Sequence, residues 1–332
     1  MSKRVVYIVD GNSLCHKYAV SGLSSNGVNT GAAFHFVNWI TERIRLGCDI
    51  PIFVFDHPDT REVGTWRSKY RTVDYRGQRT PQKHDMLGVF GAIMTAKMVL
   101  RRMGAIVVEK KGVEADDIIW CLSRRVLFGS KKSRVVIMSG DMDLWQCVTP
   151  RCAVYITSRA KAKDGTLMCG RLLVQKNFED VTGMQSIEDW NRFRAFVGDK
   201  SDNILGVRGV GPVKAAEFME KYSDRTWKQF KRAIERVWPE GHKALSSFVV
   251  AYSLMNLQYA SRLGDLPELP DIERVGFENG ELRDLAAKMK LRKLLTPMME
   301  LNGEIEGMLR ANVKLSNRFV EFLKVSKKDG LT

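Results

Sequence analysis

Carboxylates follow three short apolar runs of the sequence. Val-Tyr-Ile-Val leads into Asp10, Ile-Phe-Val-Phe leads into Asp56, and Val-Val-Ile-Met-Ser-Gly leads into Asp141 and Asp143. An acidic residue after a strand is usually a turn former or a helix cap. Three such runs, however, would place their carboxylates on one edge of a parallel sheet, which is the edge where ligand crevices form.

Two further acidic groups lie later in the chain. Glu114, Asp116 and Asp117 open a predicted helix, where negative charge is favourable. Three acids in four positions exceed what capping needs, and the i, i+3 spacing puts the first and last on one face. Asp199 and Asp202 repeat that spacing, with a polar turn between helices as the alternative interpretation.

Together these acids predict a metal centre. Carboxylates gathered in one crevice would repel and raise one another's pKa values, and hard divalent cations would relieve that repulsion. Oxygen-only ligation suits Mg²⁺, with Mn²⁺ as a substitute, and two ions can activate a water and stabilise the leaving oxygen of a phosphodiester. The candidate metal ligands and catalytic residues are Asp10, Asp56, Glu114, Asp116, Asp117, Asp141, Asp143, Asp199 and Asp202.

A basic segment with interleaved aromatic residues follows Asp56 directly. Residues 61–83 hold seven Lys or Arg against two acidic residues, a net charge of +5. Cations mixed with aromatics suit a grip on single-stranded nucleic acid by charge and stacking, and a solvated basic loop is the alternative. The candidate DNA contacts of this segment are Arg67, Lys69, Arg71, Tyr75, Arg76, Arg79 and Lys83.

A glycine-rich turn precedes a later predicted helix. Its glycines permit a tight hairpin, and Pro212 suits a first helical turn whose amides are free. Such a turn can take a backbone phosphate on main-chain N–H groups without reading bases. Many helix–turn–helix connections have similar glycines. The candidate DNA contacts here are Gly206, Arg208, Gly209, Gly211 and Lys214.

The elements that would position these residues fall into two parts. In the first half, strands predicted at residues 5–9, 51–55, 105–108, 134–139 and 153–157 alternate with helices at 31–47 and 114–126, and a hairpin turn lies at 163–166. This alternation predicts an α/β fold with a mostly parallel central sheet flanked by helices. From residue 178 the pattern is helical, over 189–197, 213–222, 226–237, 244–258 and, after a linker at 264–271, 281–302.

Composition limits the class of protein. The formal net charge of +15 and a pI near 9.6 indicate a polyanionic partner, with nucleic acid ahead of an anionic membrane surface. No apolar run approaches the roughly 18–20 residues that span a bilayer, and the first one is too short for a signal peptide, so we expect a cytoplasmic protein. Six cysteines without a Cys-x-x-Cys pair predict neither a zinc site nor a disulfide framework.

Several motifs together resemble the 5′ nuclease family, which comprises flap endonucleases, the 5′→3′ exonuclease domain of bacterial DNA polymerase I and phage 5′ exonucleases. The resemblance runs from residue 5 to about 300. Its most specific part is Glu114-Ala115-Asp116-Asp117, then Asp141-x-Asp143, then Gly-Asp-x-x-Asp-Asn. The matching segments are Val-Asp-Gly-Asn at 9–12, Phe-Val-Phe-Asp at 53–56, Tyr-Arg-Gly-Gln-Arg at 75–79, and residues 112–117, 140–144, 198–203 and 206–211.

The resemblance implies a PIN-like 5′ nuclease fold with a helical arch and a helix–hairpin–helix-type α-helical DNA-binding region. It implies a nuclease core over 1–185 with the arch at about 61–103, a helical region over 186–265, a C-terminal helical segment over 266–301 that packs back on the core, and a tail at 302–332 whose role the resemblance does not cover. In this scheme one ion is held by Asp10, Asp56, Glu114, Asp116 and Asp117, and the other by Asp141, Asp143, Asp199 and Asp202.

The resemblance also implies that Arg67 and Arg76 act near the scissile phosphate, as catalytic residues. The family usually has Lys at the position of Arg76, where Arg keeps the charge and adds a bidentate contact. K⁺ is a further candidate ligand, at the glycine-rich turn.

The implied activity is a Mg²⁺-dependent 5′→3′ exonuclease or flap endonuclease, of the stand-alone phage or bacterial kind. Its substrates would be branched or 5′-flap DNA, with RNA/DNA primer hybrids as a further class. Its partners in DNA replication and repair would be a polymerase and a single-strand-binding protein. Two alternatives remain open at this point, namely a non-catalytic branched-DNA-binding protein on the same scaffold and a PIN-type ribonuclease.

Overall fold

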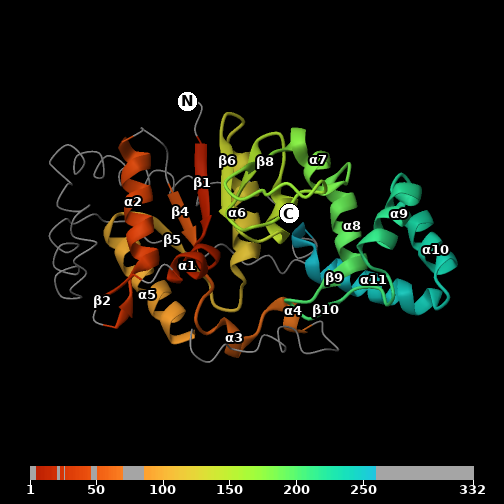
Figure 1. The fold of residues 1–332 in the computed structure, drawn as a ribbon, viewed down its shortest axis with the longest axis horizontal. Coiled ribbons are helices and arrows are strands. Elements are labelled where there is room, and N and C mark those ends of the chain that lie inside the picture. Colours follow the sequence, from red (N-terminus) through yellow and green to blue (C-terminus); the bar gives the residue numbers. More distant parts are fainter. Residues whose placement is uncertain (1–4, 21–22, 26, 46–50, 70–85, 259–332) are drawn as a thin grey trace.

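The computed structural model describes residues 5–20, 23–25, 27–45, 51–69 and 86–258 (Figure 1). Its centre is a six-stranded sheet in the order β5-β4-β1-β6-β7-β8. The bounds are β1 Val5–Asp10, β4 Pro51–Val54, β5 Ile106–Val108, β6 Arg134–Ser139, β7 Cys152–Ile156 and β8 Leu172–Leu173. Neighbouring strands pair in parallel, except β8, which runs antiparallel to β7.

The sheet confirms the predicted strands and the predicted hairpin. Each of the five predicted strands is present within one residue at either end. The chain turns at Gly165, whose N–H donates to the carbonyl of Ala162, and returns to pair with β7 through β8. Because β1 lies between β4 and β6, the carboxyl ends of these strands bring residue 10 close to the residues that follow 54 and 139.

Three helices cover one face of the sheet, namely α1 Gly11–Ala19, α2 Gly31–Arg45 and α5 Met86–Arg102. A short ribbon of β2 Ser24–Ser25 and β3 Val28–Asn29 lies between α1 and α2 in the chain. The apolar face of α5, with Ala92, Ala96, Val99 and Leu100 buried, packs into the core with α1 and α2. The end of the predicted arch at 61–103 is therefore a core helix, because its alanines and β-branched residues repeat at helical spacing.

The other face of the sheet carries α6 Ala115–Gly129 and the short helix η1 Asp143–Cys147. Ile118, Ile119, Leu122 and Val126 of α6 are at most 1% exposed, so this helix is fixed over the sheet. The core continues without a break into the helical part of the chain.

The helical part stands at one end of the molecule, with α2 and α5 at the opposite end (Figure 1). It contains η2 Gln175–Asn177, α7 Phe178–Thr182, α8 Ile187–Val197, α9 Pro212–Tyr222, α10 Trp227–Val237 and α11 Gly241–Met255, with the small ribbon β9 Gly198–Asp199 and β10 Ile204–Leu205. Phe196, Phe218, Phe230 and Phe248 meet at its centre, with ring centroids 4.6–6.1 Å apart. These elements confirm the predicted helices as far as Met255.

Between β4 and α5 the structure describes α3 Thr60–Val63 and α4 Trp66–Lys69. The predicted contacts Arg71, Tyr75, Arg76, Arg79 and Lys83 lie outside the described residues, as do the side chain of Lys69 and the segments predicted at 264–271, 281–302 and 302–332.

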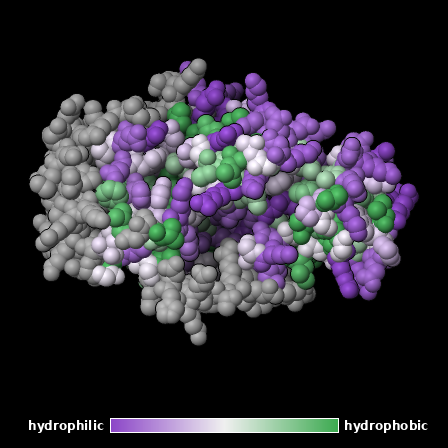
Figure 2. All heavy atoms as spheres, in the orientation of Figure 1, coloured by the Kyte–Doolittle hydropathy of each residue, from purple (hydrophilic) through white to green (hydrophobic). Residues whose placement is uncertain are grey.

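Within the described ranges no helix is long and apolar enough to cross a membrane. The described cysteines are all free. Hydrophilic residues dominate the view of the surface in Figure 2, where hydrophobic residues form small separate patches.

Candidate active site

Asp10 ends the central strand and caps α1. Its Oδ1 accepts a hydrogen bond from the N–H of Ser13 at 2.9 Å, and its Oδ2 accepts one from the Ser139 hydroxyl at 2.6 Å. The residue is 4% exposed. Burial, together with the charges of Asp141 and Asp56, raises its pKa to about 7, although the two hydrogen bonds lower it.

Asp56 follows β4 and links two elements at the same edge. Its Oδ1 accepts from the N–H of Ala115, the first residue of α6, at 2.8 Å, and its Oδ2 accepts from Nδ2 of Asn12 at 2.7 Å. A carboxylate only accepts, so the amide nitrogen of Asn12 must face it. The Asn12 carbonyl oxygen is then left buried with no hydrogen-bond partner in the described part of the chain.

Asp116, in the first turn of α6, adds a further carboxylate to this group of acids. Loss of hydration raises its pKa well above the usual value, and the charges of Asp141, Asp10, Asp143 and Asp56 raise it further. Ser139 ties the group together, because its hydroxyl donates to Asp10 and accepts from the N–H of Asp141 at 3.0 Å.

None of four carboxylates at this edge has an ion-pair partner among the described residues. We call Asp10, Asp56, Asp116 and Asp141 the unpaired acids. They come from three strand ends and one helix start, as the sequence predicted, and they act on one another electrostatically. A group of this kind concentrates negative charge without an ion-pair partner in the part of the chain that the structure describes.

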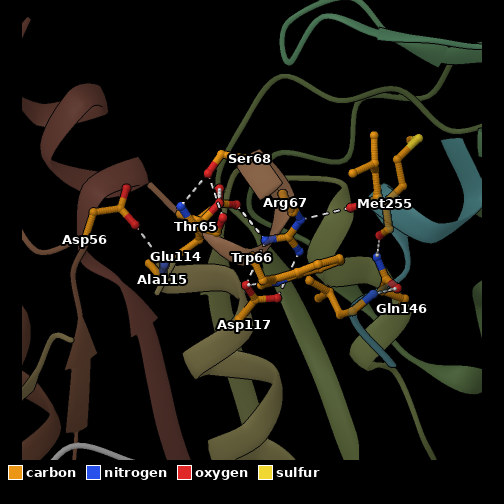
Figure 3. Close-up of polar contacts among 12 residues, drawn as sticks. Asp56, Thr65, Trp66, Arg67, Ser68, Glu114, Ala115, Asp117, Gln146 and Met255 are labelled. Carbon is orange, nitrogen blue, oxygen red and sulfur yellow. Dashed lines mark hydrogen bonds and ion pairs between the residues drawn. The ribbon is translucent and has the colours of Figure 1, made fainter. Parts of the chain in front are cut away.

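Glu114 and Asp117 behave differently, because both bind Arg67 (Figure 3). Arg67 Nη1 lies 2.7 Å from Glu114 Oε2 and 2.7 Å from Asp117 Oδ2, and Nη2 lies 2.9 Å from Asp117 Oδ1. Its Nε donates to the carbonyl of Leu254 at 2.9 Å, at the end of α11. The guanidinium thus joins α4, the start of α6 and the end of α11, and we call this arrangement the Arg67 clasp.

The two residues before Arg67 in the chain also belong to the Arg67 clasp. The indole N–H of Trp66 donates to Asp117 at 3.0 Å, and the Thr65 hydroxyl donates to Glu114 at 3.1 Å. On η1, Gln146 donates to the carbonyl of Met255 and accepts from the N–H of Leu257, so a second side chain holds the end of α11 (Figure 3). Burial raises the pKa of Asp117, and Arg67 opposes that rise.

The Arg67 clasp places Arg67 inside the protein, and a contact of Arg67 with DNA stays a prediction. The residue is 3% exposed and its donors are used inside the protein. The basic pattern of residues 61–83 predicted an exposed cation, because sequence cannot show that two buried carboxylates face this position.

The single nine-carboxylate cage is also not formed in this structure. In the described ranges, no group of three or more His, Cys, Asp or Glu residues stands close enough to hold a metal ion. Glu114 and Asp117 are turned toward Arg67 instead.

Two of the remaining aspartates, Asp143 and Asp199, share a second arginine beside the helical part. Nη2 of Arg194, on α8, lies 2.7 Å from Asp143 Oδ1 and 2.8 Å from Asp199 Oδ2. Burial, together with the charges of Asp141, Asp199 and Asp202, raises the pKa of Asp143 to about 7, although Arg194 opposes the rise. We did not predict a role for Arg194, since a lone arginine in an amphipathic helix carries no motif.

The turn after α8 places Asp199 and Asp202. Gly198 has φ +75°, and a Cβ there would collide with the backbone of Gly206 and Ile204. A Cβ at Gly206 would likewise collide with the carbonyl of Phe196. Only glycine fits these two close approaches, which bring Asp199 back to Arg194.

The glycine-rich turn itself is a compact exposed hairpin. Val207 and Val210 anchor it in the core, while Arg208, Gly209, Gly211 and Lys214 are exposed. Gly209 has φ +75°, and Gly211 caps α9 with Pro212 at its start. The ammonium of Lys214 donates to the carbonyl of Gly209 at 3.2 Å. Free helix amides and two cations therefore share one exposed corner.

Comparison with known proteins gives the family. Residues 5–178, more than half of the chain, match the family model described as the 5′-3′ exonuclease, N-terminal resolvase-like domain. The chain is 29% identical over 303 residues to a 5′-3′ exonuclease of Aquifex aeolicus, a match that covers 88% of this chain and 95% of that protein. It is 25% identical over 307 residues to the thermostable DNA polymerase I of Thermus filiformis, covering 91% of this chain but 34% of the polymerase.

Solved structures show the same fold. The T5 5′-exonuclease with bound divalent zinc ions aligns with a TM-score of 0.58 at 17% identity, over 92% of this chain and 100% of that one. The bacteriophage T5 flap endonuclease in complex with DNA and metal ions aligns with a TM-score of 0.58 at 16% identity, over the same shares of the two chains. With the sheet edge, its acids and the match over residues 5–178 taken together, the chain belongs to the 5′-3′ exonuclease family.

Proposed function

We propose that this protein is a metal-dependent 5′ nuclease that hydrolyses phosphodiester bonds of DNA near junctions between single strand and duplex. The observation that carries the proposal is the group of unpaired acids at the carboxyl edge of the sheet. Carboxylates that repel one another without an ion-pair partner cost stability, and such a cost is typical of functional sites. Family membership and the activities of similar proteins support the same reaction class.

The residues present suit hard divalent ions by their chemistry. All candidate ligands supply oxygen, four of them lack a cation among the described residues, and the Asn12 carbonyl is buried beside them without a donor. We propose that Asp10, Asp56, Asp116 and Asp141 hold Mg²⁺, or Mn²⁺ in its place, and that Asp143, Asp199 and Asp202 serve a second ion. When bound, such ions lower the pKa of a water and stabilise charge on phosphate oxygens.

The protein's own groups would then order this chemistry. Ser13 and Ser139 fix the two oxygens of Asp10, and the amide of Ala115 with the side chain of Asn12 fixes those of Asp56. Carboxylates held in this way keep one geometry during the reaction, which is how an active site limits reorganisation.

For the substrate, we propose that the exposed hairpin at residues 206–214 takes a duplex phosphate on its helix amides, together with Arg208 and Lys214, with K⁺ as a candidate ion there. A net charge of +15 supports a polyanion as substrate. We propose 5′-flap or branched DNA, with RNA/DNA primer hybrids as a second substrate class, and a role in replication beside a polymerase and a single-strand-binding protein. Residues 70–85 stay candidate contacts to the single strand.

A cleavage assay with purified protein tests the proposal. Flap DNA labelled at the 5′ end in one sample and at the 3′ end in another is incubated with Mg²⁺, with Mn²⁺ or with EDTA. We expect cleavage near the junction with either ion, a 5′-phosphate on the retained strand and no cleavage in EDTA. Binding without cleavage under every metal condition would favour a non-catalytic DNA-binding protein, and cleavage of RNA flaps alone would favour a ribonuclease.

A further inference from the structure

The two buried arginines at the candidate active site are bound to different extents. Arg67 uses Nε, Nη1 and Nη2, and each nitrogen has an acceptor within 2.9 Å (Figure 3). Arg194 makes both of its ion pairs through Nη2, while its Nη1 is buried without a hydrogen-bond partner in the part of the chain that the structure describes. A buried charged donor that lacks an acceptor costs free energy, so the Arg194 contact is the weaker of the two.

Arg194 also lies between two of the candidate metal ligands. Its guanidinium bridges Asp143, which comes from the α/β core, and Asp199, which comes from the turn after α8. Among the described residues, Arg194 is therefore the cation that pairs with Asp143 and Asp199, which we call the second aspartate group.

Resting on the proposed function, we propose that Arg194 is a resident counterion that holds the second aspartate group together before metal binds, and that competes with the divalent ion for Asp143 and Asp199. Because Nη1 of Arg194 has no partner among the described residues, a doubly charged ion can displace this guanidinium from its carboxylates. Arg67, with all three nitrogens hydrogen-bonded, keeps its carboxylates. Arg194 is thus a positioning residue that sets the concentration of divalent ion needed to occupy the site. Its removal leaves Asp143 and Asp199 free for the ion.

Metal titration without DNA tests this role. Binding of Mn²⁺ to the full chain is measured by calorimetry and by the paramagnetic resonance signal of free Mn²⁺, for the natural protein, Arg194→Gln and Arg194→Lys. One unit charge about 5 Å from a divalent ion changes affinity by about tenfold, even at the dielectric constant of water. We expect Arg194→Gln to bind Mn²⁺ about tenfold more tightly, and Arg194→Lys, which keeps the charge, to stay close to the natural protein.

Arg192→Gln is the matched control on the same helix. Arg192 is as buried as Arg194, but it pairs with Glu188, with Asp189 and with the carbonyl of Ser223, and not with Asp143 or Asp199. Both glutamine variants should melt at lower temperature in EDTA. Mn²⁺ should restore more of the melting temperature of Arg194→Gln than of Arg192→Gln.

The outcomes separate the two proposals. Equal or weaker Mn²⁺ binding by folded Arg194→Gln would show that Arg194 is a scaffold rather than a competitor, and would overturn this inference while leaving the nuclease function standing. If the natural protein and Arg194→Gln both bind no Mn²⁺, the proposed metal-dependent function fails, and the inference fails with it. Equal metal rescue of the two glutamine variants would also contradict the competition.

Discussion

The unpaired acids and the Arg67 clasp lie at the same sheet edge, yet their electrostatics are opposite. Asp116 has carboxylates as its strongest charged neighbours, and its pKa rises well above normal. Glu114 and Asp117, two residues and one residue away in the chain, are held by a guanidinium within 3 Å. Without a bound cation, repulsion among the unpaired acids destabilises the folded protein. The carboxylates of the Arg67 clasp already have a cation as partner. Acidic residues next to each other in sequence can therefore serve ligand binding and structure respectively.

Removing a charge from the unpaired acids should give the largest effect. We expect Asp116→Asn to reduce flap cleavage by about a thousandfold or more, because several kcal/mol of charge stabilisation are lost. The same variant should melt at higher temperature than the natural protein in EDTA, since one source of repulsion is gone. Single-turnover cleavage and thermal melts check the two results, and unchanged cleavage would remove Asp116 from the mechanism.

Breaking the Arg67 clasp should damage the fold. In Arg67→Ala two buried carboxylates lose their partner, which costs about 3–5 kcal/mol for a buried ion pair. Urea unfolding with and without Mg²⁺ measures this loss. A triple variant that adds Glu114→Gln and Asp117→Asn should recover part of it, because no charge then remains unpaired. A stable Arg67→Ala protein with weakened DNA binding would instead restore the sequence-based view of Arg67.

The raised pKa of Asp10, one of the unpaired acids, should make the stability of the protein depend on pH. Asp10 and Asp143 have pKa values of about 7 in the folded protein, above the unfolded value of 3.8. Between these values the folded state binds more protons than the unfolded state, so stability falls as pH rises from about 4 to 7. Melting temperatures in EDTA should show this fall, and Asp10→Asn should make it shallower. A slope identical in the two proteins would contradict the raised pKa of Asp10.

The smallest effect is expected far from both regions, at the exposed hairpin. Lys214→Ala should weaken duplex binding modestly and reduce the slope of log affinity against log salt by about 1. Glu217→Ala, on the exposed side of the same helix, is the control for a change of charge. An unchanged salt slope in Lys214→Ala would remove this lysine from the phosphate contacts.

Much of the fold could be predicted because its signals are local. The apolar runs that became β1, β4 and β6 and the acids that follow them are read directly from the sequence, as is the glycine turn before α9. Hydrophobic periodicity also predicted the bounds of α6 and α8–α10 to within a few residues.

The pairing of the acids could not be predicted, because it depends on contacts between distant segments. Arg67 and Asp117 are 50 residues apart in sequence, and Arg194 and Asp143 are 51 apart. A cation in a basic stretch looks the same whether it faces solvent or a buried carboxylate. Asn12 illustrates the same limit, since its role appears only when Asp56 is placed beside it.

The most direct test of the central claim locates the metal itself. Crystals of the protein soaked in Mn²⁺ would be measured at a wavelength where manganese scatters anomalously. We predict a peak in coordinating contact with Asp10, Asp116 or Asp141, with Arg67 still bound to Glu114 and Asp117. A peak at Glu114 and Asp117 with Arg67 displaced, or no peak at this edge of the sheet, would contradict the account.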